Sequence, residues 1–544
     1  MLGGCIGTSI NASTRTSPTL ESIPGELAED NLSRNTAPRL TGRFLTRLEA
    51  IGLAGYSHLA VGTVVLFVAL IRWRLLRDTP YPTGLDGGNW LAYGHALLGE
   101  HIRSASLVAP PIVPLLAVLG EKSFGTFDGI KVLAIASSAA PPIGLYALLY
   151  SWGFRLRAAA LAGFLAASAG TGEAMAWGGY PQLIGLGLLP VVILALDRFL
   201  TSRRAISAIP VATLMAAALA ASTLVGPITV VVALLYLPFR YVVLRTSGVS
   251  KDLRQIVIGT LLAATLAIPV APIYLGLLPG VLANEHAKHS AAGSMWAVIS
   301  GAQAPINDLP IFWLVGLVAA VTVPLTLSRE RHPLALSTMA VLVPTLALLV
   351  ITGDNRFAYF FPLAIVLGIA TWWEAFSNAA PVARNLMAAA LSCFLAVDVL
   401  VGTSYFAIQR NYYIVLTPEL VQSFDVLGAR SQSTELIAIS PVQRDWELGW
   451  WVEGVVRRRT LYAGNPVWLN YPDERERNKE ANQIFSLTND FQDSLAIARR
   501  YGVSYLLVDK AWAGYAIWSQ SIRQTDVIYD NAAVVIIATD GSEA

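Results

Sequence analysis

Residues 180–200 read YPQLIGLGLLPVVILALDRFL, a nearly uninterrupted apolar stretch. A helix that crosses a bilayer needs about 20 mostly apolar residues, so this stretch predicts a transmembrane helix. Similar stretches recur along the chain and give about eleven predicted spans of this length. They are Ile51–Ile71, Gly129–Tyr150, Arg157–Ala174, Tyr180–Leu200, Ala205–Thr223, Gly226–Leu244, Ile256–Leu278, Ile311–Leu327, Pro333–Thr352, Phe357–Trp373 and Val382–Phe406. The run 205–244 is too long for one helix, and Gly226-Pro227 is the predicted turn.

The composition also predicts a polytopic α-helical membrane protein. Of the 544 residues, 55% are hydrophobic and only 14% are charged, whereas ordinary soluble domains carry roughly 25% charged residues. This deficit excludes a disordered chain and a conventional soluble enzyme. The net charge of +2 provides no basic field for a nucleic-acid partner. Cys5 and Cys393 are far apart and have no CxxC spacing, so neither a disulfide framework nor a zinc site is available.

The distribution of basic residues predicts a cytoplasmic N-terminus and an extracytoplasmic C-terminus. Arg and Lys crowd into the loops of one side, whereas the later short loops of the other side hold only Lys288 and Arg356, the positive-inside pattern. Leu107–Leu119 is short, contains prolines, and would reverse this pattern if it spanned. We therefore expect it to be interfacial or re-entrant. The first outer loop, 72–128, is an exception whose basic residues predict contact with anionic lipid or substrate: Arg72, Arg74, Arg77, Arg103 and Lys122.

Three parts are predicted along the chain. Residues 1–50 form a disordered cytoplasmic tail, 51–406 a transmembrane module, and 407–544 a soluble extracytoplasmic α/β domain. The predicted strands of the last part are Glu435–Ser440, Thr460–Ala463, Ser504–Asp509, Asp526–Asp530 and Val534–Thr539. Its predicted helices are Leu448–Arg457, Asp473–Phe485 and Phe491–Tyr501. This part has no Gly-rich phosphate loop and no metal-ligand cluster, so its sequence predicts neither a nucleotide cofactor nor a self-sufficient active site.

Asp86 is the strongest candidate for a catalytic residue. It follows the first span in TGLDGGNWLAYGHALLGEHIR, residues 83–103, where flanking glycines allow a ligand to approach the backbone closely. The apolar face of the following residues suits a helix in the membrane interface. A carboxylate held there can act as a general base or bind a divalent cation. The alternative is the ordinary role of Asp as a helix N-cap.

A resemblance to a known family starts at this segment. From about Tyr56 to Gly125 the order is a span, an Asp in a Gly-rich outer loop, an amphipathic helix, and a Pro-Pro-containing apolar stretch that ends in KSFG. This order resembles the polytopic C-type glycosyltransferases, which include the protein mannosyltransferases and the aminoarabinose transferase of lipid A. The predicted span number and orientation, and RYGVSYLLVD at residues 500–509, are also similar to that family.

The resemblance implies a chemistry and a substrate class. In the family, the acid in the place of Asp86 is the catalytic base or a ligand of a divalent cation, here Mg²⁺ or Mn²⁺. The implied donor is a sugar on polyprenyl phosphate, without a nucleotide cofactor. The chain departs from the family at two places. Glu173 stands alone where relatives carry an acidic pair, and WELGWW at 446–451 lacks the Asp of the WWD motif, which argues against peptide glycosylation of that type.

Glu173 and Arg356 are the next candidates. Glu173 lies at the outer end of the third span, where an ionisable residue is a functional hypothesis: it would bind the acceptor hydroxyl or share a cation with Asp86. The alternative is a carboxylate wetted at the interface. Arg356 opens the tenth span in GDNRFAYFFPLA, and the family often has an Arg-aromatic pair followed by Pro there. Its guanidinium would clamp the lipid phosphate, unless it merely snorkels to the headgroups.

Substrate contacts are predicted in the first outer loop, around the connection between the third and fourth spans, and in a long outer loop. Loops longer than about 15 residues are often functional or disordered, so Leu278–Pro310 is the predicted lid. Lys288 would bind the donor phosphate there, and its neighbours would bind substrate, although all may simply be solvated. Aromatic rings can stack on sugars but also populate the interfacial belt. The predicted substrate-binding residues are Trp90, Trp177, Tyr180, His286 and His289.

The function predicted from these features is an inverting transfer of a sugar from polyprenyl phosphate to a lipid, glycan or protein acceptor at the outer face of the cytoplasmic membrane. The partners are therefore the donor, the acceptor and membrane lipids. The main alternative is a transporter or flippase, which would place charges within its spans. Asp197 and Asp398 are the main carboxylates within spans, but the other acidic candidates lie at span ends. A non-catalytic scaffold that kept the fold is a third possibility.

Overall fold

The computed structural model describes residues 37–540 except 101–108, 203, 245–248, 277–332, 353–354, 378–380, 443–447, 465–468 and 470–471. The chain divides into two compact units, Met1–Ala54 and Gly55–Ala544. The second unit contains the apolar helices, the C-terminal sheet and most of the predicted site. The predicted span Ile311–Leu327 and the loop residues His286, Lys288 and His289 lie outside the described residues.

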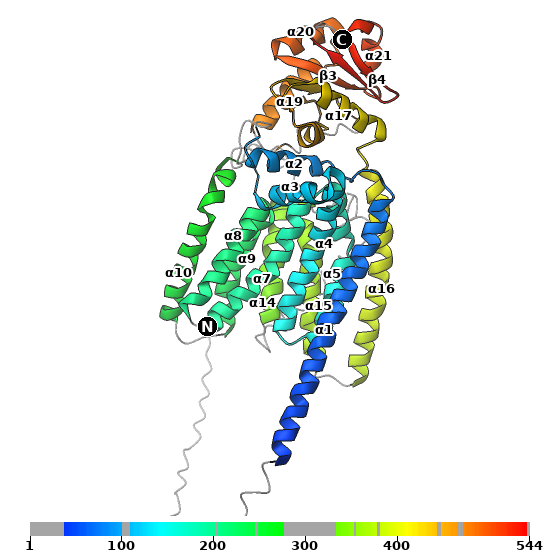
Figure 1. Cartoon of the computed structure of the whole chain (residues 1–544). Coiled ribbons are helices and arrows are strands. Elements are labelled where there is room, and N and C mark those ends of the chain that lie inside the picture. The colour runs from blue at the N-terminus through cyan, green and yellow to red at the C-terminus, as the bar shows by residue number, and fades with distance from the viewer. Residues whose placement is uncertain are drawn as a thin grey trace, which may run out of the picture. The chain divides into compact units, whose positions relative to one another are not determined.

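Apolar helices form the bulk of the second unit (Figure 1). Within the described residues, four segments are long and apolar enough to cross a membrane: Gly55–Arg77, Thr126–Ser151, Tyr180–Ser202 and Val257–Gly276. These helices and the fold comparisons below indicate a multi-pass membrane protein. The helices of the bundle are α1 Ala37–Arg77, α4 Thr126–Ser151, α5 Arg155–Ala167, α6 Ala169–Trp177, α7 Tyr180–Ser202, α8 Ala208–Ala221, α9 Val225–Leu244, α10 Val249–Ala267, α14 Pro333–Thr352, α15 Phe361–Ser377 and α16 Pro381–Tyr412.

The third predicted span was wrong as a single helix. It is divided at Ser168, whose extended backbone (φ −57°, ψ 142°) separates α5 from α6. The Ser168 hydroxyl donates to the Leu165 carbonyl at 2.9 Å and lies 2.7 Å from the Thr171 hydroxyl. These side-chain hydrogen bonds compete with a continuous helix. The short helix α6, which carries Glu173, is therefore not a straight continuation of α5.

The long apolar run 205–244 also turns at a different place from the predicted one. Ser222 leaves the helical conformation (φ −149°, ψ 129°) after α8, and α9 already begins at Val225. The Ser222 hydroxyl accepts a hydrogen bond from the Val225 amide at 3.1 Å and so caps α9. The turn therefore precedes Gly226-Pro227 and depends on a serine cap.

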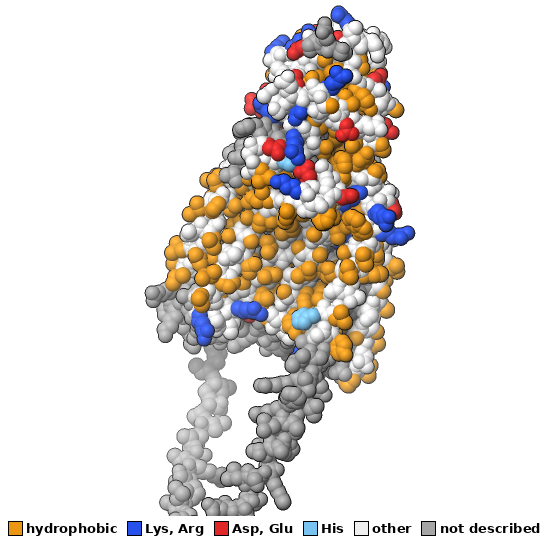
Figure 2. All heavy atoms as spheres, viewed as in Figure 1, with side chains coloured by type: hydrophobic (Ala, Val, Ile, Leu, Met, Phe, Trp, Pro, Cys, Tyr) orange, Lys and Arg blue, Asp and Glu red, His pale blue; other side chains and the backbone are white. Residues whose placement is uncertain are grey.

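The surface of the bundle is apolar, as a surface in contact with lipid requires. Figure 2 shows hydrophobic side chains over the visible face of the bundle, whereas charged side chains gather over the C-terminal region. Large exposed hydrophobic residues include Phe67 on α1, Leu261 on α10 and Leu400 on α16, which are 57%, 62% and 69% exposed. Arg72, predicted to contact lipid or substrate, is instead 5% exposed and donates to the Ala166 carbonyl at 2.7 Å. It helps to hold α1 against α5.

Two short helices lie across one end of the bundle, beneath the C-terminal sheet (Figure 1). They are α2, Asp86–Leu97, and α3, Ile112–Phe124, of 12 and 13 residues. Both are shorter than the roughly 20 residues needed for a span, so the apolar segment Leu107–Leu119 contains no spanning helix in its described part. We call this end of the bundle, where α1 and α16 finish and α4 and α7 begin, the sheet end.

The C-terminal region contains a five-stranded mixed sheet in the order β2-β1-β3-β5-β4. Strands β1 Leu436–Ile439, β2 Arg459–Tyr462 and β3 Val503–Asp509 are parallel, and β4 Val527–Asp530 and β5 Val534–Ala538 pair antiparallel beside them. The helices are α17 Pro418–Arg430, α18 Gly449–Trp451, the π-helical turn η6 Val452–Val456, α19 Pro472–Ile484, α20 Phe491–Arg500 and α21 Tyr515–Trp518. All five predicted strands and the predicted helices Asp473–Phe485 and Phe491–Tyr501 are confirmed. The helix predicted at Leu448–Arg457 is instead a three-residue α-helix followed by the π-helical turn.

A shared hydrophobic core joins the C-terminal region to the sheet end of the bundle. One cluster of buried residues contains Leu91 of α2, Leu133 of α4, Trp451 of α18 and Ile437 of β1. Burial of apolar surface is the dominant stabilising contribution in such a contact. The C-terminal region is therefore packed onto the helices that hold Asp86.

Candidate functional site

Asp86 is the first residue of α2, and Leu85 occupies the N-cap position without a side-chain hydrogen bond to the helix. The N-terminus of a helix carries a partial positive charge, which favours a carboxylate there. Asp86 is half-buried, and its neighbours Gly87 and Gly88 are buried. The segment after the first span thus presents the carboxyl group at the sheet end without using it as a helix cap.

The loop between α6 and α7 forms one wall of the site. Gly178 has φ +103°, and a β-carbon added there would lie 2.7 Å from the Cβ of Asp86. Only glycine combines that backbone conformation with so close an approach. The indole N–H of Trp90 donates to the Gly178 carbonyl at 2.8 Å, which ties α2 to this loop. Trp90 therefore has a positioning role in the structure, in addition to the predicted contact with substrate.

Charged residues from distant parts of the chain surround Asp86. Burial raises the pKa of the Asp86 carboxyl to about 8; the positive charge of Arg356 opposes the rise and the negative charge of Glu474 adds to it. Tyr180, which is 1% exposed, lies within electrostatic reach of Asp86. A carboxylate with such a pKa is a stronger base than an ordinary aspartate, and it can act as a general base in its deprotonated form, which predominates above about pH 8.

A short 3-10 helix, η4, connects Asp86 to the other predicted acid. It spans Asn355–Phe360 and carries both Arg356 and Tyr359, and residues three apart lie on the same side of a 3-10 helix. Arg356 acts on Asp86, while the Tyr359 hydroxyl hydrogen-bonds to Glu173. Glu173 is 2% exposed. The alternative that Glu173 is a carboxylate wetted at the interface is therefore wrong.

Trp177 and Tyr413 complete this side of the site. The indole N–H of Trp177 donates to the Tyr359 hydroxyl at 3.1 Å, which continues the chain of hydrogen bonds from Glu173. The backbone carbonyl of Tyr413 accepts a hydrogen bond from the Gly84 amide at 2.9 Å. Burial raises the pKa of the Tyr413 phenol, and the negative charges of Glu173 and Asp86 raise it further. Tyr413, which follows α16, is thus near both predicted acids.

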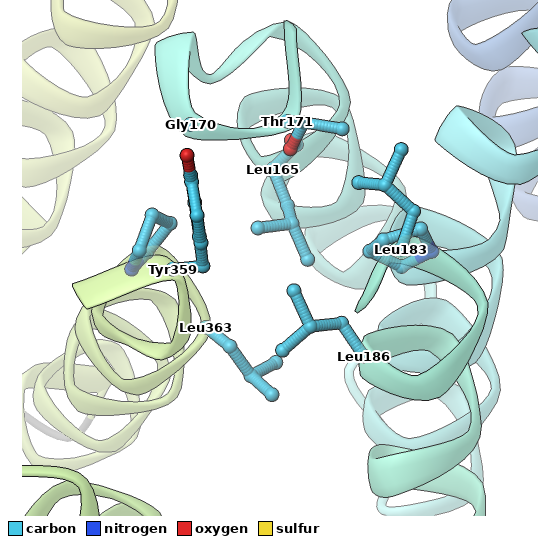
Figure 3. A pocket seen from close by; sticks show the side chains of 9 residues that line it. Leu165, Gly170, Thr171, Leu183, Leu186, Tyr359 and Leu363 are labelled. Carbon is cyan, nitrogen blue, oxygen red and sulfur yellow. The ribbon is translucent and has the colours of Figure 1, made fainter. Parts of the chain in front are cut away.

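An apolar pocket lies inside the bundle next to Tyr359 (Figure 3). Leucine and proline side chains supply most of its walls, and the Tyr359 ring borders it. The lining residues are Pro141, Leu165, Gly170, Thr171, Leu183, Leu186, Tyr359, Pro362 and Leu363. Because Tyr359 also bonds to Glu173, the pocket adjoins the polar part of the site.

The C-terminal region covers α2 from the opposite side. The indole N–H of Trp451 donates to the Gly84 carbonyl at 3.0 Å, and the Trp451 ring is fully buried. A β-carbon at Gly88 would lie 2.5 Å from the Cα of Trp451, so the glycine permits the two backbones to touch. The glycines around Asp86 therefore accommodate the C-terminal region as well as the α6–α7 loop.

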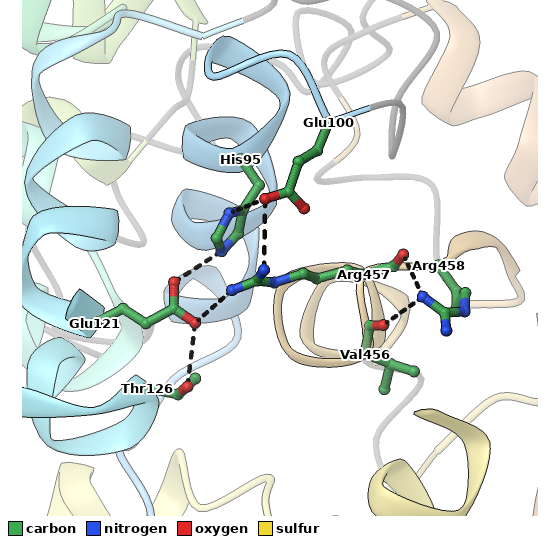
Figure 4. A network of polar contacts seen from close by, with 7 residues as sticks. All are labelled: His95, Glu100, Glu121, Thr126, Val456, Arg457 and Arg458. Carbon is green, nitrogen blue, oxygen red and sulfur yellow. Dashed lines mark hydrogen bonds and ion pairs between the residues drawn. The ribbon is translucent and has the colours of Figure 1, made fainter. Parts of the chain in front are cut away.

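A network of charged side chains reinforces this contact (Figure 4). His95 of α2 lies between two carboxylates, with Nδ1 3.0 Å from Glu100 and Nε2 2.8 Å from Glu121. Arg457, which follows η6, reaches the same two glutamates at 3.5 and 3.3 Å. Arg457 is 44% exposed, so these pairs are weak individually. Together they connect the C-terminal region to α2 and α3.

The structure brings together most of the predicted site residues. Asp86, Glu173, Arg356 and the aromatic residues Trp90, Trp177 and Tyr180 belong to one connected region at the sheet end. It also contains residues that the sequence analysis missed: Tyr93, Tyr359, Tyr413, Trp451 and Glu474. Tyr359 was within the quoted GDNRFAYFFPLA segment. Glu474 gave no signal, because PDERERNKE at 472–480 has the composition of a solvated helix.

The donors at this site fit a hard divalent cation only in a limited way. Within the described residues, no group of three or more His, Cys, Asp or Glu side chains is arranged to hold a metal ion. Asp86 and Glu474 act on each other electrostatically. Mg²⁺ commonly binds through one or two protein carboxylates, with waters and substrate phosphates completing its shell. Asp86 and Glu474 could therefore hold Mg²⁺ together with waters and substrate phosphate. They could not enclose it with protein ligands alone.

Solved structures of glycosyltransferases have a similar fold. ArnT from Cupriavidus metallidurans in the apo state has a TM-score of 0.57 and 17% identity, over 89% of this chain and 99% of ArnT. Its structure bound to undecaprenyl phosphate has a TM-score of 0.56 and 14% identity, over 88% and 98% of the two chains. The Archaeoglobus fulgidus oligosaccharyltransferase tethered with an acceptor peptide has a TM-score of 0.53 and 13% identity, over 85% and 71%.

These proteins are C-type glycosyltransferases, so the predicted resemblance is confirmed at the level of the fold. No protein-family model matches the chain, and no curated protein matches it.

Proposed function

We propose that the protein is a membrane glycosyltransferase that moves a sugar from a polyprenyl-phosphate donor to a lipid, glycan or protein acceptor. The observation that carries the proposal is the juxtaposition of Asp86 and Arg356, a carboxyl group with a pKa of about 8 and a fixed positive charge, at one end of an apolar bundle. The C-type glycosyltransferase fold supports the reaction class. ArnT binds undecaprenyl phosphate, which supports the donor class.

Asp86 acts as the general base in the proposed reaction. An acceptor hydroxyl attacks the anomeric carbon of the donor and gives its proton to the Asp86 carboxylate. The new bond joins the acceptor oxygen to the anomeric carbon, while the bond from that carbon to the phosphate oxygen breaks. The electron pair leaves with the polyprenyl phosphate. Attack from the face opposite the phosphate inverts the anomeric configuration, and positive charge develops on the sugar in the transition state.

Arg356 stabilises the departing phosphate. Its guanidinium can donate two parallel hydrogen bonds to phosphate oxygens, and a preformed positive charge stabilises negative charge that develops in the transition state. Its action on Asp86 places it within electrostatic reach of the base. Lys288 is a second proposed ligand of the phosphate, and His286 and His289 are proposed contacts of the sugar. A bound Mg²⁺ or Mn²⁺ at Asp86 would supply additional charge for the phosphate.

Glu173 is proposed to bind the acceptor hydroxyl or to share a cation with Asp86. The hydrogen bond to Tyr359, which Trp177 continues, would position its carboxyl group. Trp177 and Tyr180 are proposed to contact the sugar ring. In this arrangement the sheet end faces the outside of the cytoplasmic membrane and the N-terminus faces the cytoplasm.

Transfer assays with Asp86→Asn test the proposal. Membranes that carry the wild type or the variant receive a panel of radiolabelled polyprenyl-phosphate sugars, with and without EDTA. Loss of a general base lowers rates by about 10²–10⁴-fold, so label should reach an acceptor only with the wild type. Asp78→Asn is the matched control, since Asp78 is exposed and belongs to the same segment. Transfer that persists unchanged in Asp86→Asn would remove Asp86 from the mechanism.

A further inference from the structure

Trp451 of the C-terminal region contacts the backbone on both sides of Asp86. Its indole N–H donates a hydrogen bond to the Gly84 carbonyl at 3.0 Å, two residues before Asp86. Its ring lies against Gly87, where an added β-carbon would approach the ring carbons to 2.9 Å. Its backbone lies against Gly88, where an added β-carbon would lie 2.5 Å from the Cα of Trp451. Trp451 is fully buried, so the first turn of α2 rests on a side chain that water does not reach.

Gly84 fixes the segment that leads into Asp86. Its backbone has φ +90°, and an added β-carbon would lie 2.5 Å from the Trp177 carbonyl carbon. Its amide donates to the Tyr413 carbonyl at 2.9 Å, while its own carbonyl accepts from Trp451. The α6–α7 loop, the residue after α16 and the C-terminal region therefore meet at this glycine. Of the two hydrogen bonds, only the one from Trp451 comes from a side chain and can be removed by substitution.

The position of Asp86 matters because a general base must lie within hydrogen-bond reach of the proton that it removes. A displacement of about 1 Å can lower the rate by about 10²-fold. Asp86 opens α2 directly after Gly84 and Leu85, so its carboxyl group follows any movement of Gly84. The indole of Trp451 carries no charge. Its influence on Asp86 is therefore one of position and of exclusion of water.

We propose that Trp451 is a positioning residue that holds Asp86 for general-base catalysis, so that the C-terminal region controls the reactivity of the base in the transmembrane module. This inference rests on the proposed glycosyl transfer and adds to it a residue that acts through Asp86. It assigns a role to the segment WELGWW at 446–451, whose last tryptophan acts on the base and not on the substrate.

Trp450 offers a matched control, because it differs from Trp451 in this hydrogen bond. It is also buried, with 5% exposed, but its indole N–H has no hydrogen-bond partner within the part of the chain that the structure describes. Replacement of either tryptophan by Phe keeps an aromatic ring and removes the N–H. In transfer assays with full-length protein in membranes, Trp451→Phe should lower kcat by about ten- to a hundredfold. The donor KM of this variant, and both constants of Trp450→Phe, should stay within about twofold of the wild-type values.

The pH–rate profile separates positioning from a merely structural role. A smaller folded fraction lowers the rate without moving the acidic limb of kcat/KM. A displaced first turn of α2 admits water to Asp86, whose raised pKa is caused mainly by burial, so this pKa should fall. The acidic limb of Trp451→Phe should therefore move to lower pH, while Trp450→Phe keeps the wild-type profile.

Hydrogen exchange of the purified protein in detergent tests the contact without transfer. Loss of one hydrogen bond should speed amide exchange at residues 84–90 by about two- to tenfold in Trp451→Phe, and Trp450→Phe should exchange like the wild type. Unfolding temperatures in detergent show whether Trp451→Phe folds. If it does not, Gly88→Ala carries the test, because its added β-carbon displaces α2 from Trp451 and should change kcat and the acidic limb in the same directions.

The outcomes distinguish this inference from the proposed function. Wild-type kinetics with an unmoved acidic limb in Trp451→Phe, or equal losses in the two Phe variants, would overturn the positioning role while wild-type transfer upholds the proposed function. Absence of transfer by the wild type with every donor would overturn the proposed function. The exchange comparison then decides whether Trp451 positions the Asp86 segment, and equal exchange in the two Phe variants would overturn that as well.

Discussion

The two sides of Asp86 are built in different ways. Toward the bundle, Arg356 and Glu173 come from interruptions in apolar helices, at η4 and α6. Toward the C-terminal sheet, Glu474 and Trp451 come from an ordinary polar helix and a buried turn. A charged residue stands out against an apolar segment and is unremarkable within a polar one. This difference explains why the residues on the bundle side of Asp86 could be predicted from the sequence. The residues on the C-terminal side are identified only in the folded structure.

The largest effect after loss of Asp86 should come from Arg356, on the bundle side. Arg356→Gln removes a preformed charge from the departing phosphate and should lower kcat by about 10²–10³-fold. Arg356→Lys keeps the charge but not the forked geometry and should lose less. Steady-state rates of the two variants at saturating donor measure this difference. A guanidinium that merely snorkels to the headgroups would leave both rates close to the wild-type value.

The pH dependence should report the protonation of Asp86. The pKa of this carboxyl is about 8, so the base is protonated below that pH and kcat/KM should fall about tenfold per pH unit on the acidic side. Arg356 lowers this pKa, so Arg356→Gln should move the acidic limb to higher pH. A pH–rate profile of the wild type and of this variant provides the comparison. A shift of the limb to lower pH in Arg356→Gln would contradict the assigned electrostatics.

The raised pKa of the Asp86 carboxyl also makes the stability of the folded protein depend on pH, whether or not the protein transfers a sugar. In the folded protein the carboxyl titrates near 8, compared with an ordinary value of 3.8. Its contribution to stability is complete below about pH 4 and is lost as the pH rises through the folded value near 8. Thermal unfolding in detergent above pH 8 should therefore show Asp86→Asn to be more stable than the wild type.

The smallest effect is expected at the edge of the contact with the C-terminal region. Arg457→Ala removes two exposed pairs, with Glu100 and Glu121, and should lower the free energy of unfolding by less than about 1 kcal/mol. The rate of transfer should change little, because the buried Trp451 and the close packing at Gly88 also hold this contact. Denaturation in detergent and a transfer assay measure the two quantities. A loss of transfer as large as that of Asp86→Asn would mean that this network, and not the packing around Trp451, positions the base.

Much of the fold follows from patterns of the sequence alone. The apolar runs at Tyr180–Ser202 and Thr126–Ser151 became helices, and the alternating segments of the C-terminal region became the predicted strands. The predicted helix boundaries were wrong where serine side chains form hydrogen bonds with the backbone at a helix end. Ser168 and Ser222 interrupt apolar stretches whose hydropathy shows no boundary at those points. Hydropathy reports burial and is insensitive to such local capping.

The sequence analysis singled out residues whose type conflicts with that of their surroundings. Asp86 among glycines, Glu173 near a span end and Arg356 at the start of an apolar stretch all met that condition. Glu474 did not, because Asp473, Arg475 and Glu476 around it have the same character. Its burial arises from the packing of α19 beside η6, a contact between segments that are separated in sequence. Only tertiary structure distinguishes this carboxylate from its solvated neighbours.

The most direct test of the account is a stoichiometric transfer measurement with purified protein in liposomes. A polyprenyl-phosphate sugar labelled in the sugar is mixed with acceptor, and both glycosylated product and released polyprenyl phosphate are quantified for the wild type and Asp86→Asn. We predict equal amounts of the two products with the wild type and loss of both with the variant, while Asp78→Asn resembles the wild type. Movement of intact donor across the bilayer without cleavage, equally in all three proteins, would contradict the account and identify a flippase.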